Sequence, residues 1–295
     1  MSQILILQNG KKLGYAVYGD SQASRAAFYM HGFPGSRIEG SIMQASALKL
    51  GFKIIAPERF GYGLSDPDPE RTIANWPSSV GALADHLGIS SFYMIGLSGG
   101  GAYATSCALA LRERVLALAL LSSMGPIDTP DGQRGTVLLN RMLLALGKHL
   151  PAISVPVFKT VGTVWRLSPS AARRWLRLIL HSSDQQVLGS SDIAQVFEAN
   201  VTEALRNSIE GACKDFELMT RAWRLDLSKI ACPTKVWHGD ADNYVSPAMG
   251  QYLADAIPGA IYTNIPGAGH FGALRVIPDV LEWLGSSPSQ RNAVS

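Results

Sequence analysis

Residues 92–111 have the sequence FYMIGLSGGGAYATSCALAL, and this stretch decides the fold. Its first four residues are apolar and predict a short buried strand, while the small residues from Gly100 onward predict a helix. Between them, residues 96–100 (Gly-Leu-Ser-Gly-Gly) match the pattern G-x-S-x-G. A strand-to-helix turn with this pattern is typical of an exposed serine nucleophile, here Ser98, and a glycine-rich helix cap is the alternative. Glycines are needed because a β-carbon beside the serine would collide with the neighbouring strand or helix.

Strands and helices alternate on both sides of this motif. Strand patterns cover residues 26–30, 52–56, 92–95 and 115–121, and helix patterns cover residues 42–50, 78–87 and 100–111. The strands are apolar throughout, as a parallel sheet covered on both faces requires. A hairpin around Asn9-Gly10, with strands at 4–7 and 13–18, precedes the alternation. We therefore predict an α/β fold with a doubly wound, mostly parallel sheet.

The alternation stops near Gly125 and resumes near Ile230. The stretch between them has no strand pattern; helices are expected at 137–146, 171–180 and 193–223, with Pro130, Pro151, Pro156 and Pro169 as breaks outside these helices. Strands at 234–237 and 260–265 and helices at 247–256 and 277–284 then complete the pattern. We predict three segments: a first part of the α/β core at 1–124, an inserted helical cap at 125–229 and a second part of the core at 230–295.

The composition excludes several classes of protein. The chain has 295 residues, of which 47% are hydrophobic and 17% charged, with a formal net charge of +3. That charge leaves no electrostatic footprint for nucleic acid, and the longest apolar run, residues 115–121, is too short for a membrane span. Cys107, Cys213 and Cys232 are far apart, which is typical of buried thiols rather than of a disulfide framework or a zinc site. The first residues lack a signal-peptide pattern, so we expect a cytoplasmic protein. We also expect that it acts without a metal or cofactor.

A serine hydroxyl needs a base within hydrogen-bond reach, and the chain has six histidines. His270 follows the last predicted strand, at the sheet edge where catalytic loops lie. The base in turn needs a carboxylate, and the loop after the preceding strand offers Asp240 and Asp242. Asp240 is close enough to the strand end to serve the turn, so we predict Asp242 as the acid, with Asp128 as its competitor. The order Ser98, Asp242, His270 is that of one known triad class.

The other histidines suit structural roles. His31 and His238 end strands and precede glycine, which favours hydrogen bonds to nearby backbone. His86, His149 and His181 fall in helical patterns, where surface or packing positions are expected.

The developing oxyanion needs preorganised N–H donors. One is the backbone of Gly99, directly after the serine. The other is expected from residues 31–35, His-Gly-Phe-Pro-Gly, in which Phe33 is the natural donor. Pro34 has no N–H and fixes the loop beside that donor. By itself the string also fits a tight turn, but its place before the core helix favours the oxyanion role.

These strings together resemble the α/β-hydrolase superfamily over nearly the whole chain. The matching strings are residues 31–35, RFGYGLSD at 59–66, residues 96–100, the acid loop at 239–242 and Gly269-His270. The family usually has an aspartate before the arginine of the second string, where this chain has Glu58. The resemblance implies that the insertion from Gly125 to about Ile230 is a cap over the site.

The resemblance to subfamilies names no substrate. The string at 31–34 is similar to that of epoxide hydrolases and haloalkane dehalogenases, but those families attack with an aspartate where this chain has Ser98. With Gly35 the string is similar to that of proline iminopeptidases. Those enzymes, however, usually carry a tryptophan after the nucleophilic serine, where this chain has Gly99.

The predicted cap has more apolar residues than a small lid needs for its own packing. We expect part of this surface, with Trp165 and Trp175, to line an apolar substrate pocket. Arg173, Arg174 and Arg177 offer a different hypothesis, recognition of a charged substrate, against the alternative of a solvated helix face.

We predict a serine hydrolase that cleaves a small-molecule carboxylic ester, lactone or thioester with an apolar acyl or aryl part, through an acyl-enzyme. The alternatives keep the triad and cleave an N-terminal peptide bond, as proline iminopeptidases do, or a carbon-carbon bond. An aminopeptidase would need a cap carboxylate such as Glu198, Glu203 or Glu210 to hold the substrate amine. A non-catalytic ligand receptor is a third hypothesis, which an intact Ser-His-Asp set disfavours. No oligomeric state is indicated.

Overall fold

The computed structural model describes residues 2–127, 134, 136, 138–168, 170, 174 and 180–287. Its centre is an eight-stranded sheet in the order β1-β2-β4-β3-β5-β6-β7-β8. The strands are β1 (Ser2–Ile6), β2 (Lys12–Gly19), β3 (Arg25–Met30), β4 (Phe52–Pro57), β5 (Phe92–Leu97), β6 (Val115–Leu121), β7 (Thr234–Gly239) and β8 (Ile261–Ile265). β2 is antiparallel to β1 and β4, and the other neighbouring strands are parallel. The predicted hairpin and parallel sheet are confirmed.

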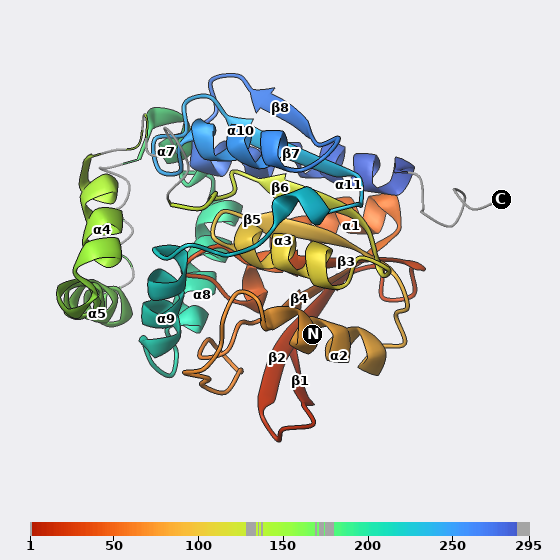
Figure 1. Ribbon diagram of the computed structural model, residues 1–295, viewed down its shortest axis with the longest axis horizontal. Coiled ribbons are helices and arrows are strands. Elements are labelled where there is room, and N and C mark those ends of the chain that lie inside the picture. The colour runs from red at the N-terminus through yellow and green to blue at the C-terminus, as the bar shows by residue number, and fades with distance from the viewer. Residues whose placement is uncertain are drawn as a thin grey trace.

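Helices cover both faces of the sheet (Figure 1). On one face α1 (Gln44–Leu50), preceded by the 3₁₀ helix η1 (Arg37–Met43), packs against α11 (Ile277–Ser286). On the other face lie α2 (Trp76–His86), α3 (Gly100–Ala110) and α10 (Pro247–Ala256). Two short 3₁₀ helices, η2 (Leu227–Lys229) and η3 (His270–Val276), complete the core. The doubly wound arrangement is therefore confirmed.

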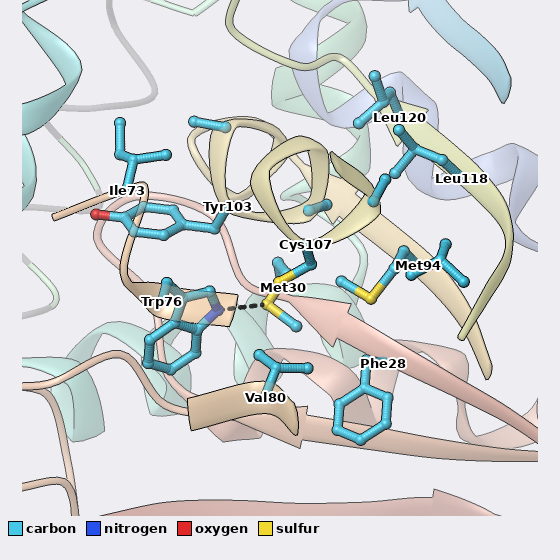
Figure 2. Close-up of a cluster of buried hydrophobic side chains, with 14 of the residues drawn as sticks. Phe28, Met30, Ile73, Trp76, Val80, Met94, Tyr103, Cys107, Leu118 and Leu120 are labelled. Carbon is cyan, nitrogen blue, oxygen red and sulfur yellow. Dashed lines mark hydrogen bonds between the residues drawn. The ribbon is translucent and has the colours of Figure 1, made fainter. Parts of the chain in front are cut away.

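The larger core cluster lies between the sheet and α3 (Figure 2). The residues of α3 that face the sheet are small, which allows the helix to approach the strands closely. Cys107 of α3 packs over Met30 of β3 and Met94 of β5, all with at most 1% of their surface exposed. Trp76 of α2 closes the side of the cluster and directs its indole Nε1 to Met30 Sδ at 3.2 Å. This packing fixes the start of α3, which directly follows Ser98.

Between β6 and β7 the described chain is helical. Its helices are α4 (Leu138–His149), α5 (Pro151–Leu167), α7 (Ser182–Val187), α8 (Ser191–Ala204) and α9 (Glu210–Met219). The single helix predicted at 193–223 is wrong, because the chain forms α8 and α9 with a break between them. Helix α5 is unpredicted, since Pro156 inside it is typical of a helix break. The helix predicted at 171–180 falls mostly outside the described residues.

The described helices include none with the length and apolar content that crossing a membrane requires. The division of the chain into segments 1–124, 125–229 and 230–295 stays a prediction.

Candidate active site

Ser98 occupies a strained turn between β5 and α3. Its backbone φ is +52°, a left-handed conformation that costs energy for a residue other than glycine. A β-carbon on Gly96 would lie 2.8 Å from the Cβ of Ala104, and one on Gly100 would lie 2.1 Å from the carbonyl oxygen of Met30. The glycines of the motif are therefore needed for the steric reason that the sequence suggests.

The fold brings Ser98, His270 and Asp242 together in one hydrogen-bonded chain. His270 Nε2 lies 3.0 Å from Ser98 Oγ, and His270 Nδ1 lies 2.8 Å from Asp242 Oδ2. Their exposed fractions are 6%, 4% and 2%. The residues follow β5, β8 and β7, whose carboxyl ends meet at one edge of the parallel sheet. In this arrangement His270 donates its Nδ1 proton to Asp242, and its Nε2 can accept the Ser98 proton.

Asp242 is held in place by its own loop. Its Oδ1 accepts the backbone N–H groups of Tyr244 at 2.9 Å and Val245 at 2.8 Å. Its Oδ2 also lies 3.2 Å from Nε2 of His238, whose Nδ1 has no hydrogen-bond partner among the described residues. Burial alone would raise the pKa of Asp242, but the His270 ring and the hydrogen bonds from both histidines hold that pKa well below its usual range. The carboxylate is therefore ionised and oriented toward His270.

The two competing aspartates differ in their placement. Asp240 accepts a hydrogen bond from the backbone N–H of Gly267 at 2.7 Å and another from Asn264 Nδ2 at 3.2 Å, so its carboxylate ties the loop after β7 to β8 and the loop that follows it rather than to its own turn. Asp128 lies outside the described residues.

Asp184 of α7 is a buried carboxylate that the sequence analysis missed. Its Oδ2 accepts the backbone N–H of His270 at 2.8 Å, and its Oδ1 accepts that of Phe271 at 2.8 Å. Burial would lower the pKa of His270, but the negative charges of Asp242, Asp184 and Glu39 raise that pKa above its usual value. The local sequence around Asp184 carries no signal for this role, because the partners are 86 and 87 residues away.

His31 and His238 make the backbone contacts that the sequence predicts. His31 Nδ1 lies 2.9 Å from the carbonyl oxygen of Gly32, and its Nε2 accepts the backbone N–H of Arg59 at 3.3 Å. His238 Nε2 lies 3.1 Å from the carbonyl oxygen of Val245. Both rings are at most 1% exposed, which suits structural roles.

The predicted oxyanion residues, Phe33 and Gly99, are neighbours beside Ser98. A β-carbon on Gly99 would lie 3.0 Å from the Cβ of Phe33, and one on Gly32 would lie 3.7 Å from the Cβ of Ser98. Glu39 accepts the backbone N–H of Gly32 at 2.6 Å, so that group is engaged away from the serine. The turn at residues 31–35 thus lies against Ser98, with Phe33 as the residue next to Gly99.

A small pocket opens on Ser98, and its cavity volume is about 40 Å³. Its described lining residues are Phe33, Ser98, Met124, Thr136, Leu144, Phe216, Met219, Tyr244, Val245, Ser246 and Met249. Leu144 comes from α4, and Phe216 and Met219 come from α9, so the helices between β6 and β7 form one wall. None of these lining residues carries a charge at neutral pH, and most are apolar. The pocket suits a small apolar group.

Of the two tryptophans expected in the pocket, only Trp165 belongs to the described residues. Trp165 of α5 is not among the described lining residues and packs edge-on against Phe197, with ring centroids 6.1 Å apart. Trp175 lies outside the described residues, as do Arg173 and Arg177, and Arg174 is exposed.

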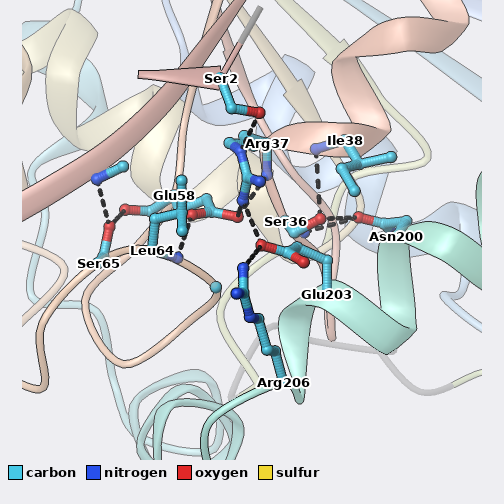
Figure 3. Close-up of polar contacts among 12 residues, drawn as sticks. Ser2, Ser36, Arg37, Ile38, Glu58, Leu64, Ser65, Asn200, Glu203 and Arg206 are labelled. Carbon is cyan, nitrogen blue, oxygen red and sulfur yellow. Dashed lines mark hydrogen bonds and ion pairs between the residues drawn. The ribbon is translucent and has the colours of Figure 1, made fainter. Parts of the chain in front are cut away.

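Figure 3 shows the polar cluster around Glu58, at the position where the family usually has aspartate. Arg37 Nη1 donates to Glu58 Oε1 at 2.6 Å and to Glu203 Oε1 of α8 at 2.6 Å. Glu203 is thus engaged by a cation, and Glu210 is exposed. Neither of these carboxylates nor Glu198 is among the described residues that line the pocket.

A second unpredicted group joins α9 to the turn at residues 31–35. Asp215 is fully buried and accepts hydrogen bonds from Arg59 Nε at 2.7 Å and Arg71 Nη1 at 2.5 Å. The hydroxyls of Tyr62 and Tyr103 also donate to it, at 2.9 Å and 2.6 Å. Burial would raise the pKa of Asp215, but the two guanidinium groups hold it well below its usual range.

A family model described as the alpha/beta hydrolase fold matches residues 28–274. The chain belongs to the α/β-hydrolase fold family. It is 25% identical to the uncharacterized hydrolase YcgS of Bacillus subtilis, over 97% of this chain and 94% of that one. It is 24% identical to the 2-hydroxymuconate semialdehyde hydrolase of Pseudomonas putida, over 74% of this chain and 70% of that one.

Among solved structures of this family, the fold is similar to that of a thermophilic esterase from Thermogutta terrifontis. The TM-score is 0.70 at 22% identity, over 97% of this chain and 99% of that chain. With hydrolases as its relatives by sequence, this chain is an α/β-hydrolase enzyme.

Proposed function

We propose that this α/β-hydrolase is a serine hydrolase that cleaves a carboxylic ester, thioester or lactone with a small apolar acyl part. The observation that carries the proposal is the buried Ser98–His270–Asp242 hydrogen-bonded chain, which opens on an uncharged pocket. In this proposal the helices between β6 and β7 act as a cap over the site, which the pocket contributions of α4 and α9 support.

The proposed reaction begins at Ser98. His270 Nε2 takes the hydroxyl proton while Oγ attacks the substrate carbonyl carbon, and the N–H groups of Phe33 and Gly99 stabilise the oxyanion. Collapse of the tetrahedral intermediate expels the alcohol or thiol, which takes the proton from His270. Water, deprotonated by His270, then attacks the acyl-enzyme and releases the carboxylic acid while Ser98 regains its proton. Asp242 stabilises the imidazolium in both steps.

The pocket favours a neutral substrate over the two alternatives with the same triad. An aminopeptidase needs a carboxylate for the substrate amine, and the described lining has none. A carbon-carbon bond hydrolase whose substrate carries a carboxylate needs a cationic side chain beside that carboxylate, and the described lining has no cationic side chain. An uncharged acyl group would leave no buried charge unpaired in this pocket.

Labelling with a fluorophosphonate probe tests the proposed nucleophile. The wild-type chain should be labelled, and the folded Ser98→Ala variant should not be labelled. The same variant should lose ester hydrolysis by at least about a thousandfold, because the three residues act as a unit. Turnover of a mixed library of esters, lactones and N-terminal peptides by the wild type then identifies the bond. The proposal would be contradicted if the wild-type protein were neither labelled by the probe nor able to hydrolyse any ester of the library.

A further inference from the structure

The hairpin formed by α4 and α5, residues 138–167, presents a large share of the exposed apolar side chains. The described part of the chain has ten large apolar side chains that are strongly exposed, and six of them belong to this hairpin. The six, with exposed fractions from 51% to 78%, are Leu138, Met142, Leu150, Ile153, Val164 and Leu167. Figure 1 shows the hairpin at the outer edge of the molecule. Exposed apolar side chains gathered in one element mark an interaction surface.

The exposed positions of each helix form a stripe. On α4 they recur at 138, 141, 142, 145, 148 and 149, with the three- and four-residue steps of one helix face. The opposite face of α4 is buried: Leu144 lines the pocket, and a β-carbon on Gly147 would lie 2.8 Å from the ring of Phe216. On α5 the exposed positions include 153, 156, 160, 164 and 167, again in steps of three or four residues. One face of each helix thus packs on the protein, and the other faces outward.

The charge of this surface has one sign. Residues 132–183 contain eight of the 26 Lys and Arg of the chain and none of its 23 Asp and Glu. The rest of the chain therefore has 18 basic and 23 acidic residues and is net negative. Four of the cations, Arg141, Lys148, Lys159 and Arg166, are exposed on the hairpin itself. Apolar and cationic side chains therefore share the outward faces.

We propose that the α4–α5 hairpin docks on an anionic lipid surface. Interfacial helices combine an apolar face, which enters the headgroup region, with cations that attract anionic lipids. A second copy fits less well, because a two-fold contact would bring the same cations together without an acidic partner. Docking would place the pocket beside the membrane, since Leu144 lies on the inner face of the same helix. That last consequence rests on the proposed hydrolase function.

Vesicle flotation tests the docking. Wild-type protein should float with vesicles of phosphatidylcholine and phosphatidylglycerol and should not float with phosphatidylcholine alone. The double variant Met142→Glu/Val164→Glu should bind the anionic vesicles at least about tenfold more weakly. The matched control Ile4→Glu/Ile261→Glu, on exposed apolar positions of the edge strands β1 and β8, should bind as the wild type does. Hydrolysis of a water-soluble ester should be equal in all three proteins.

Three results would overturn the docking proposal. One is wild-type protein that fails to float with either vesicle, and another is equal flotation of both double variants. The third is a wild-type dimer in sedimentation velocity that the hairpin variant loses, which would identify a second copy as the occupant. None of these results depends on the identity of the hydrolysed bond, so the proposed function is tested separately.

The buried cluster around Asp215 carries a second, independent inference. Arg59 Nη1 donates to the carbonyl oxygen of His31 at 2.6 Å, and its Nη2 donates to that of Gly32 at 2.7 Å. The peptide bond between Gly32 and Phe33 is trans, so its C=O and N–H point in opposite directions. Because the carbonyl is directed at Arg59, the Phe33 N–H is directed away from Arg59, and the Cβ of Phe33 itself lies beside Gly99.

We infer that Asp215 and Arg59 are positioning residues for the oxyanion donor, an inference that rests on the proposed serine-hydrolase function. Asp215 fixes the guanidinium through Nε, and the guanidinium fixes two consecutive carbonyls of the turn. Arg71 binds the same carboxylate, but its Nη2 donates to the carbonyl oxygen of Gly211 in α9 instead. Arg71 therefore shares the cluster and its burial without contact to the turn, which makes it the matched control.

The variants Arg59→Lys and Arg71→Lys separate positioning from stability. Arg59→Lys should lower kcat by about 10²–10³ with little change in KM. It should also weaken the binding of an aryl trifluoromethyl ketone by a similar factor, because this inhibitor forms a tetrahedral adduct with the serine. Arg71→Lys should lower Tm comparably and keep kcat within a few-fold of the wild type. If Arg59→Lys does not fold, Asp215→Asn replaces it in the same comparison. Equal kcat losses in both arginine variants, or a wild-type kcat in folded Arg59→Lys, would overturn the inference, while an unlabelled wild type in the fluorophosphonate assay would instead contradict the proposed function.

Discussion

The substitution Asp242→Asn would move the imidazole proton of His270 from Nδ1 to Nε2, while it keeps the shape of the site. Oδ1 of Asp242 accepts two backbone N–H groups at 2.9 Å and 2.8 Å, so the asparagine oxygen should take this place. The NH₂ group of the asparagine then faces His270 Nδ1, which lies 2.8 Å from Oδ2 in the wild type. A donor there favours the tautomer with its proton on Nε2, and Nε2 then cannot accept the proton of Ser98.

The size of the expected effect follows from this loss of the base. With the wrong tautomer and without a carboxylate to stabilise the imidazolium, kcat should fall by about 10⁴, which corresponds to about 5.5 kcal/mol of transition-state stabilisation. KM should change little, because Asp242 is not among the described residues that line the pocket. The fold should persist, since the asparagine oxygen keeps both backbone hydrogen bonds.

The assay is p-nitrophenyl acetate hydrolysis by the wild type, Asp242→Asn and the control Asp240→Asn, with Tm measured for each. Asp240 lies two residues away, and its carboxylate accepts hydrogen bonds from Asn264 of β8 and from Gly267 in the loop after β8, outside the triad. Its variant should keep kcat within a few-fold of the wild type. A loss below about tenfold in Asp242→Asn, or an equal loss in Asp240→Asn, would refute the reasoning.

Three further outcomes are expected. The wild-type kcat/KM should rise with pH through a midpoint above ~6.5, because only neutral His270 accepts the Ser98 proton and its pKa is raised; a lower midpoint would contradict His270 as the base. Asp184→Asn should lower Tm and move this midpoint to lower pH, because a negative charge and an acceptor oxygen beside His270 are lost; an unchanged profile in the folded variant would argue against that role. For p-nitrophenyl esters, kcat/KM should gain up to about fourfold per methylene and level off near butanoyl, because a cavity of about 40 Å³ holds about three water-sized groups; a rise that continues to octanoyl, or a slope that Trp165→Ala flattens, would show a different pocket.

The sequence by itself determined the α/β core and the candidate triad. Apolar strand patterns and the glycines around Ser98 act over a few residues, where period and steric exclusion leave few alternatives. Parallel strands bring their carboxyl ends to one edge, so the loops with Asp242 and His270 could be predicted to meet Ser98.

Only the tertiary structure decided what surrounds that triad. Asp184 and Asp215 are ordinary acidic residues in helical sequence, and their roles depend on partners 86 to 156 residues away. Trp165 packs against Phe197 rather than on the pocket, because burial depends on which helix face meets which neighbour. Pro156 is accommodated inside α5, although the local pattern indicates a break. Such outcomes follow from long-range packing and from the pairing of buried charge, and neither leaves a periodic signal along the chain.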